Sequence, residues 1–145
     1  MAGFNVAIVG AIEIVGQEII KVLEQRKFPV ASIQLLDPGY FSGVKLLFNH
    51  QRTEVKEAKA GAFRDVDIAF FSAGADISRR LAPLAADAGA VVIDNSVAFR
   101  MNPAVPLVVP EVNPGDIEWH KGVIASPKCS TIQMVVTLYP LHKIN

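Results

Sequence analysis

The chain has 145 residues, with 14 basic and 14 acidic side chains and a formal net charge of zero. This length predicts one domain with a sizeable core. The charge balance excludes the basic surface of a nucleic-acid-binding domain and the acidic composition of a solvating tail. Hydrophobic residues make up 51% and charged residues 19% of the chain. We therefore expect more apolar surface than one small domain usually buries.

The sequence carries no signal for a membrane span or a disulfide. No apolar run approaches the roughly 20 residues that cross a bilayer. No Lys or Arg precedes Lys21, so the charged start of a signal peptide is absent. The single cysteine, Cys129, excludes an intramolecular disulfide and a cysteine-based zinc site. We expect a cytoplasmic protein without a metal, a membrane or a nucleic acid as partner.

Apolar, β-branched runs that end at glycine or turn residues predict buried strands, and apolar residues three and four apart predict helices. Asp76 or Ser78 is expected to cap the second helix and Gly89 to end it. In chain order we predict a strand over 4–9, a helix from 14 to Phe28-Pro29, a strand over 32–36, an edge hairpin within 43–57, a strand over 66–71, a helix from 76 or 78 to about 88, a strand over 90–93, a mostly extended, proline-rich segment over 101–121 with a short helix near 116–119, a short strand over 123–125 and an apolar helix over 130–143.

Strands that are apolar throughout and alternate with helices predict a parallel sheet that is covered on both faces. The predicted fold is therefore α/β, a Rossmann-like, doubly wound, mostly parallel sheet with helices on both faces. Ligands of such sheets bind at the carboxyl ends of the strands. Those ends are predicted at 10–13, 37–41, 72–75, 95–100 and 126–129.

The segment Gly10-Ala11-Ile12-Glu13-Ile14-Val15-Gly16 joins the first strand to the first helix. A dinucleotide pyrophosphate would meet free N–H groups there, although such a loop also serves simply to connect a strand tightly to a helix. The carboxylate of Glu13 would lie about 5 Å from the phosphate oxygens, with a repulsion of about 3 kcal/mol per charge pair at an effective dielectric constant near 20. The same carboxylate favours the empty helix by complementing its dipole.

Cys129 is the candidate nucleophile. It follows Ser126-Pro127-Lys128 at a predicted helix start, and both a helix N-terminus and a neighbouring lysine favour the thiolate. The alternative interpretation is a buried structural cysteine. The sequence places no general base beside it, and the three histidines are interpreted as surface residues: His50, His120 and His142.

Five blocks of the chain resemble the N-terminal, nucleotide-binding portion of bacterial aspartate-β-semialdehyde dehydrogenase. The resemblance runs from the first strand to Asn145, and the last block surrounds the family's nucleophile. The blocks are FSAG at 71–74, VIDNS at 92–96, AFRM at 98–101, PLVVPEVNP at 106–114 and CSTIQM at 129–134.

The resemblance implies a reaction and roles for particular residues. The family reduces aspartyl phosphate to aspartate semialdehyde with NADPH, in the biosynthesis of lysine, methionine and threonine. In the oxidative direction a cysteine thiolate attacks the aldehyde, hydride leaves to NADP, and phosphate cleaves the thioester. Carried over, Cys129 would be the catalytic nucleophile and Arg100 would bind the substrate phosphate. The cofactor cleft would be lined by Gly10, Ala11, Val15, Gly16, Ser72, Ala73, Gly74 and Asn95.

The departures from the family pattern fall on the functional loops. Ile12 and Glu13 occupy the last two positions of the family's Gly-Ala-Thr-Gly loop, and Tyr40 stands where the family carries an arginine for the adenosine 2′-phosphate. Asp37 could instead accept a ribose hydroxyl, which favours NAD over NADP. Lys128 replaces the asparagine before the nucleophile. NADP is thus the cofactor that the resemblance implies, NAD is the alternative, and Glu13 and Tyr40 weigh against binding of either.

The resemblance also implies a second domain, which supplies an acid/base histidine, a substrate-binding arginine and most of a dimer interface. Residues 1–145 would form one NAD(P)-binding domain without that partner, so we expect the isolated chain to lack dehydrogenase activity. We also expect it to form a homo-oligomer through its exposed apolar surface. The alternatives are a non-enzymatic remnant or interaction module that binds no cofactor, and an NAD-binding regulator that uses its thiol as a redox sensor.

Overall fold

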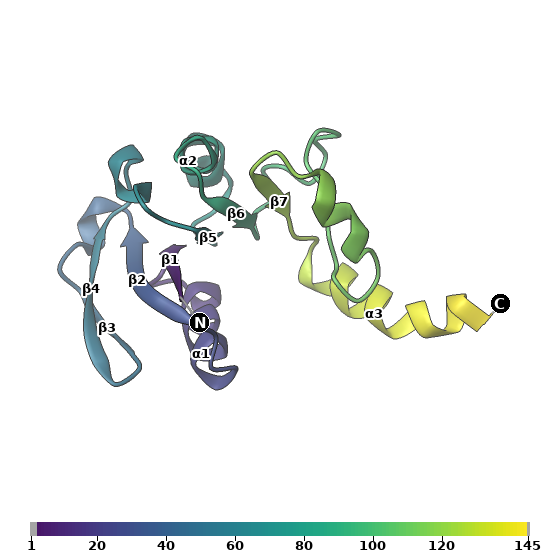
Figure 1. Cartoon of the computed structure of the whole chain (residues 1–145), viewed down its shortest axis with the longest axis horizontal. Coiled ribbons are helices and arrows are strands. Elements are labelled where there is room, and N and C mark those ends of the chain that lie inside the picture. Colours follow the sequence, from purple (N-terminus) through teal and green to yellow (C-terminus); the bar gives the residue numbers. More distant parts are fainter. Residues whose placement is uncertain (1–2, 145) are drawn as a thin grey trace.

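The computed structural model describes residues 3–144 and shows a seven-stranded sheet (Figure 1). The strand order is β3-β4-β2-β1-β5-β6-β7, and every neighbouring pair is parallel except β3 with β4, the predicted edge hairpin. The strands are β1 (Phe4–Val9), β2 (Val30–Asp37), β3 (Lys45–Phe48), β4 (Gln51–Glu57), β5 (Ile68–Phe71), β6 (Val91–Asp94) and β7 (Val123–Ala125). The helices are α1 (Ile14–Gln25), α2 (Ala75–Asp87) and α3 (Cys129–Ile144), with 3-10 helices η1 (Gly39–Phe41), η2 (Ala60–Phe63) and η3 (Pro114–Trp119).

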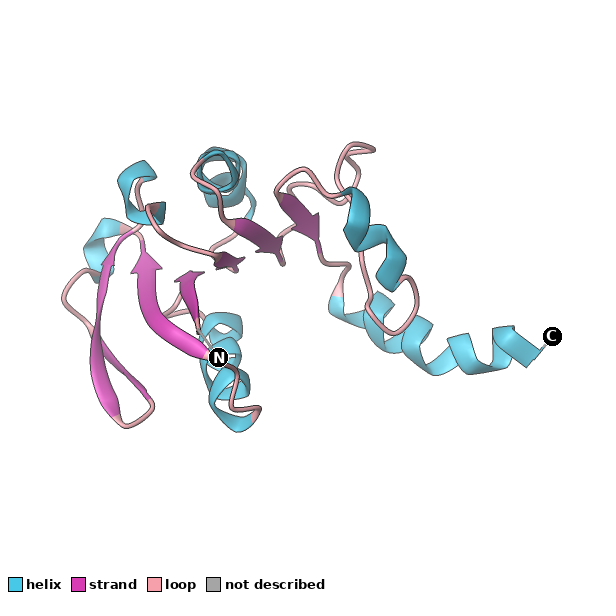
Figure 2. Cartoon of the chain, in the orientation of Figure 1, coloured by secondary structure: helices cyan, strands magenta, loops and turns pink. Residues whose placement is uncertain are grey.

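The central strand β1 supplies both layers of the core. Its side chains alternate, so that Val6 and Ile8 pack in the cluster that contains the buried face of α1, whereas Ala7 and Val9 pack in the cluster that contains α2 and η2. All four are completely buried. Helices α1 and α2 therefore cover opposite faces of the sheet (Figure 2), which confirms the predicted doubly wound α/β class.

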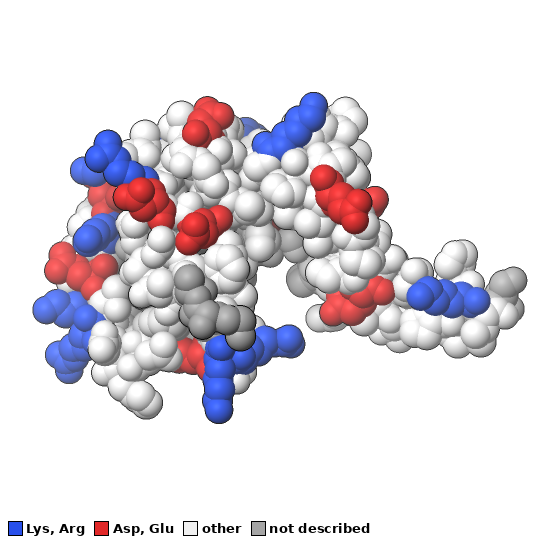
Figure 3. Space-filling model, in the orientation of Figure 1, with Lys and Arg blue, Asp and Glu red and all other residues white. Residues whose placement is uncertain are grey.

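The last helix, α3, extends away from the sheet and has no buried residue (Figure 1). Met134, Leu138 and Leu141 are each more than half exposed, although an apolar helix normally packs one face against another element. Charges of both signs are interspersed over the rest of the drawn face, whereas Lys143 is the only charged side chain in α3 (Figure 3). No helix within residues 3–144 has the length and apolar character needed to cross a bilayer. Self-association through this surface stays a prediction.

The predicted cap of α2 is wrong. Gly74, with a φ of 91°, is the N-cap and no side chain caps the helix. Asp76 instead pairs with Arg79 at 2.9 Å on the surface. Ser78 lies on the buried face of α2, where its hydroxyl is directed at the sheet rather than at the helix end. Gly89, with a φ of 100°, follows the last turn as predicted.

Asp37, the last residue of β2, ties that strand to the loop after β1. The residue is 1% exposed, and its Oδ2 accepts a hydrogen bond from the Ile12 N–H at 2.8 Å. Its Oδ1 is buried without a hydrogen-bond partner, and no other side-chain N or O atom in the described part of the chain shares that condition. Burial raises the pKa of Asp37, the Ile12 hydrogen bond opposes this rise, and the nearby Glu13 carboxylate adds to it.

The raised pKa predicts a pH-dependent stability. Between the ordinary pKa of 3.8 and the higher folded-state pKa, the folded chain binds more protons than the unfolded chain. The free energy of unfolding therefore rises as the pH falls from neutral through this window. We expect wild type to gain stability relative to Asp37→Asn between pH 7 and pH 4, as measured by urea denaturation at each pH. A difference between the two proteins that does not change with pH would contradict this assignment.

Truncation of a stacked aromatic pair in the core on the α2 side of the sheet should lower the stability of the fold strongly. The rings of Phe63 and Phe71 are completely buried and stacked, with centroids 5.8 Å apart. Phe63→Ala should lower the free energy of unfolding by about 3–5 kcal/mol, because it leaves a cavity among packed side chains. Leu47→Ala is the matched control, since Leu47 is 62% exposed and its loss should cost within about 0.5 kcal/mol. Comparable losses in both variants would show that the Phe63 site is not part of the core.

Candidate functional site

Loops that the sequence assigned to the site lie side by side at the carboxyl ends of the parallel strands. The residue after each of these strands extends the backbone ladder by donating its N–H to a carbonyl of a neighbouring strand. These bonds join Gly10 to Leu36, Ser72 to Val9, Asn95 to Phe71 and Ser126 to Asp94, at 2.8–2.9 Å. The candidate site therefore rests on four loops that the sheet itself holds side by side.

Two glycines allow α1 and β5 to approach the loop after β1. Gly10 has a φ of +90°, and a Cβ there would lie 2.6 Å from the backbone nitrogen of Ala73. A Cβ on Gly16 would overlap the carbonyl oxygen of Gly10. Ala11 is completely buried and donates its N–H to Leu36 at 3.2 Å. These loop residues thus contribute through backbone packing.

The N-terminus of α1 presents free backbone N–H groups that could bind an anion, and beside them the negatively charged carboxylate of Glu13. The first-turn amides of Ile14, Val15 and Gly16 have no acceptor within the helix. Glu13 is the N-cap, and its exposed carboxylate makes no capping hydrogen bond. A phosphate at this helix end would meet free N–H groups and, beside them, an uncompensated carboxylate.

A cleft of about 320 Å³ opens beside this helix end. It is lined by residues from the loops after β5 and β6 and from the first turns of α1 and α2: Val15, Ser72, Gly74, Ala75, Asn95, Ser96 and Val97. A second hollow, of about 270 Å³, shares Val15 and Asn95 and runs along α1 to Phe70. The structure thus brings together Val15, Ser72, Gly74 and Asn95 of the predicted cofactor residues, whereas Gly10, Ala11, Gly16 and Ala73 do not line the cleft.

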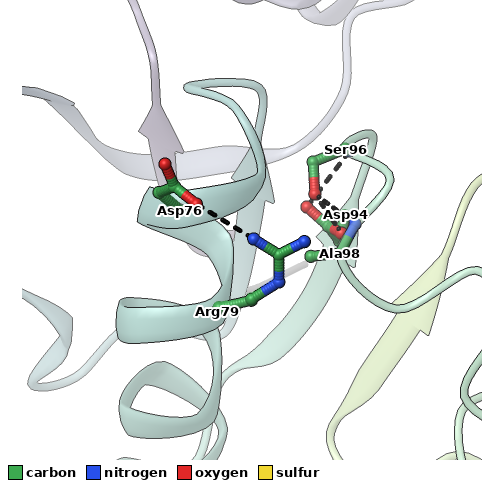
Figure 4. A network of polar contacts seen from close by, with 5 residues as sticks. All are labelled: Asp76, Arg79, Asp94, Ser96 and Ala98. Atoms are coloured by element: carbon green, nitrogen blue, oxygen red, sulfur yellow. Dashed lines mark hydrogen bonds and ion pairs between the residues drawn. The ribbon is translucent and has the colours of Figure 1, made fainter.

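A buried aspartate organises the loop below Asn95, and sequence reasoning missed it. The Asp94 carboxylate accepts hydrogen bonds from the hydroxyls of Ser78 at 2.6 Å and Ser96 at 2.8 Å, and from the Ser96 N–H at 3.2 Å. The Ser96 hydroxyl in turn accepts one from the Ala98 N–H at 3.0 Å (Figure 4). An aspartate at the end of an apolar strand is the one sequence signal that could have pointed to this network.

Arg100 connects two of the strand ends. Its Nε donates to the carbonyl of Ser126 and its Nη2 to the carbonyl of Asn95, both at 2.8 Å. The guanidinium therefore holds the loops after β6 and β7 together. Ser126, its contact in the second loop, is three residues before Cys129. The remaining N–H groups of Arg100 are available to a planar anion.

Cys129 begins α3 and is exposed, so the alternative of a buried structural cysteine is wrong. Lys128 directly precedes it, and the Lys128 carbonyl accepts the hydrogen bond from Ile132 that opens the helix. Lys128 and the first turn of α3 thus lie next to Cys129 along the chain, and its thiol is open to a reaction partner.

Two of the three histidines lie far from this thiol. His50 lies in the turn between β3 and β4, at the opposite edge of the sheet from β7. His142 is 13 residues further along α3, which is about 20 Å at the rise of an α-helix. The Nδ1 of His120 accepts a hydrogen bond from the Gly122 N–H at 3.0 Å. These positions agree with the interpretation of His50 and His142 as surface residues.

Comparison with known proteins shows the family. The model of the semialdehyde dehydrogenase NAD-binding domain matches residues 5–120. The chain is 50% identical over 141 residues to aspartate-semialdehyde dehydrogenase of Bacillus subtilis and 51% identical over 143 residues to that of Aquifex aeolicus, with 97% of this chain covered in each case. The chain spans only 41% and 42% of the length of these two relatives.

Solved structures agree with this assignment. Aspartate semialdehyde dehydrogenase II of Vibrio cholerae, complexed with ASA, matches with a TM-score of 0.94 at 45% identity, over 97% of this chain and 47% of that one. The enzyme of Candida albicans with NADP matches with a TM-score of 0.81 at 27% identity, over 97% of this chain and 47% of that one. The sheet, the strand-end loops and the exposed cysteine therefore belong to a member of the semialdehyde dehydrogenase family, of which this chain spans the NAD-binding domain.

Proposed function

We propose that this chain is the nucleotide-binding, cysteine-bearing part of an enzyme that interconverts aspartyl phosphate and aspartate semialdehyde with a nicotinamide dinucleotide. One observation carries the proposal: Arg100 joins the loop of Asn95, which lines the cleft, to the loop that leads to the exposed Cys129. A dinucleotide cleft, a phosphate-binding fork and a nucleophile thus share one edge of the sheet. Relatives of about half-identical sequence that carry this enzyme's name support it.

The exposed thiol of Cys129 would form the covalent bond of the reaction. In the oxidative direction its thiolate attacks the aldehyde carbon, and a bound dinucleotide would supply the hydride acceptor. Phosphate then cleaves the thioester, which restores the thiolate and releases aspartyl phosphate. The free N–H groups of Arg100 would hold the phosphate in a bidentate arrangement.

The cleft residues would position the dinucleotide. The amides of Ile14, Val15 and Gly16 would donate to its pyrophosphate, and the cleft beyond them would take the nicotinamide half. The Ser72 hydroxyl is directed at the carbonyls of Val9 and Gly10, at 3.1 and 3.2 Å, so its role is to shape the loop. Glu13 opposes the same pyrophosphate by charge repulsion.

A second candidate function is an interaction module that binds no cofactor. Two features favour an interaction module. The carboxylate of Glu13 lies in the loop after β1, and the apolar face of α3 is exposed. Cofactor titration separates the two functions, because only the first requires binding in the cleft.

Removal of the charge at Glu13 should strengthen cofactor binding. We expect Glu13→Gln to bind NADH about threefold or more tightly than wild type, because it removes a carboxylate beside the pyrophosphate while solvent screening limits the gain. Isothermal titration calorimetry of the 145-residue chain measures both Kd values.

Glu18→Gln is the matched control, since it removes an exposed charge one turn further along α1. Its Kd should stay close to that of wild type. Equal Kd values for wild type and Glu13→Gln would contradict the electrostatic role of Glu13. Absence of binding at millimolar NADH in every variant would favour the interaction module.

The lysine beside the thiol should control its reactivity. We expect Lys128→Asn to slow alkylation of Cys129 by iodoacetate at pH 7 by about two- to threefold, because the positive charge of the neighbouring lysine attracts this anionic reagent. Mass spectrometry of this single-cysteine chain follows the reaction directly. Lys143→Asn, at the other end of α3, is the control and should leave the rate unchanged. Equal rates in Lys128→Asn and wild type would rule out an effect of Lys128 on the thiol.

A further inference from the structure

The turn after β2 has an unusual balance of charge. Asp37 presents one oxygen to the Ile12 N–H, while its other oxygen is buried without a partner. Glu57 lies opposite Asp37 in the β2–β4 ladder, and its Oε1 is 3.3 Å from the position that a Cβ on Gly39 would occupy. The segment 38–44 that follows contains no lysine and no arginine. The end of β2 is therefore acidic and offers no cation of its own.

This place in the fold has a defined use in doubly wound sheets. The ribose next to the adenine lies at the end of the second strand, where an acidic side chain accepts a hydrogen bond from the 2′-hydroxyl. A 2′-phosphate instead requires a nearby arginine. Asp37 provides the acceptor, and the turn that begins at Pro38 provides no guanidinium.

We propose, on the basis of the function proposed above, that Asp37 determines the cofactor specificity of this chain. Its Oδ1 accepts a hydrogen bond from the ribose 2′-hydroxyl, and its charge excludes a 2′-phosphate, so the cleft takes NAD(H) in preference to NADP(H). The hydroxyl supplies the partner that Oδ1 lacks, and a buried acceptor without a partner is unfavourable. A 2′-phosphate would instead be brought close to the carboxylates of Asp37 and Glu57.

A small movement of the turn gives the ribose access to Asp37. Because the residue is 1% exposed, a hydroxyl reaches Oδ1 only when neighbouring atoms shift. The adjacent 3-10 helix η1 contains no buried residue, and its Tyr40 is 80% exposed. Displacement of η1 therefore leaves every fully buried side chain in place, and the packing that it disrupts is that of the half-buried Phe41 against the core cluster of α1, β2 and β4. Lys59 pairs with Glu57 at 3.4 Å, with both side chains more than half exposed, so its positive charge is offset by that carboxylate.

Paired titrations of the 145-residue chain with NAD⁺ and NADP⁺ test the assignment. By isothermal titration calorimetry we expect wild type to bind NAD⁺ at least about tenfold more tightly than NADP⁺, a factor that corresponds to about 1.4 kcal/mol. Asp37→Asn keeps the shape of the side chain and should reduce the ratio severalfold. Asp37→Ser combined with Tyr40→Arg should reverse it. Asp87→Asn, which removes an exposed charge at the end of α2, is the control and should leave the ratio unchanged.

Each outcome bears on the assignment. Equal affinities in wild type, a preference for NADP⁺, or a ratio that Asp37→Asn leaves unchanged would overturn the role of Asp37 while leaving the cofactor function in place. Binding of neither nucleotide by wild type and by Glu13→Gln would overturn the proposed cofactor function, and this inference with it. The ratio of the NAD⁺ and NADP⁺ affinities is measured within one protein, and far-ultraviolet circular dichroism shows whether that protein is folded. Reduced stability of a variant therefore cannot be mistaken for either result.

Discussion

The position of β1 between β2 and β5 is the constraint on which the rest of the molecule depends. Residues 6–9 are completely buried, because helices cover both faces of the sheet and parallel strands flank both edges of β1. Parallel neighbours end at the same edge, so the loop after β1 turns in the narrow space between two other loops. Gly10 and Gly16 fit there because a Cβ on either would collide with backbone atoms. The shape of the loop after β1 therefore follows from the packing of the sheet.

Charged and polar side chains then tie the strand-end loops to one another. Asp37 joins β2 to the loop after β1, Asp94 joins β6 to α2, and Arg100 joins the loops after β6 and β7. The two aspartates differ in how completely they are satisfied. Asp94 accepts three hydrogen bonds, whereas Asp37 accepts one and keeps an oxygen without a partner. A buried carboxylate that is fully hydrogen-bonded stabilises the loop, whereas one that is half satisfied is unfavourable as long as its second oxygen lacks a partner.

The nucleotide-binding half of the site is built differently from the half that carries the nucleophile. The loops of 10–16 and 72–75 lie against packed core on both faces of the sheet. Cys129 lies where the sheet has already ended, at the start of a helix whose apolar side chains have no cover among residues 3–144. The chain spans about two fifths of the length of its relatives. The proposed dinucleotide site therefore rests on packed core, while the environment of the thiol depends on what α3 contacts.

Local sequence determined the helices and strands of this protein. Contacts between residues distant in the sequence determined which side chains meet at the candidate site. The strands and helices were predictable because burial on both faces makes parallel strands apolar throughout and because Gly89 and Pro29 mark helix ends. The resemblance in turn predicted Cys129 and Arg100 as site residues, since their neighbours carry the family's motifs. The sequence did not show that Ser78 binds Asp94, that Asp37 is directed at Ile12, or that Arg100 clamps Ser126. These pairs are 16, 25 and 26 residues apart, and only the folded sheet brings such distant positions within hydrogen-bond distance.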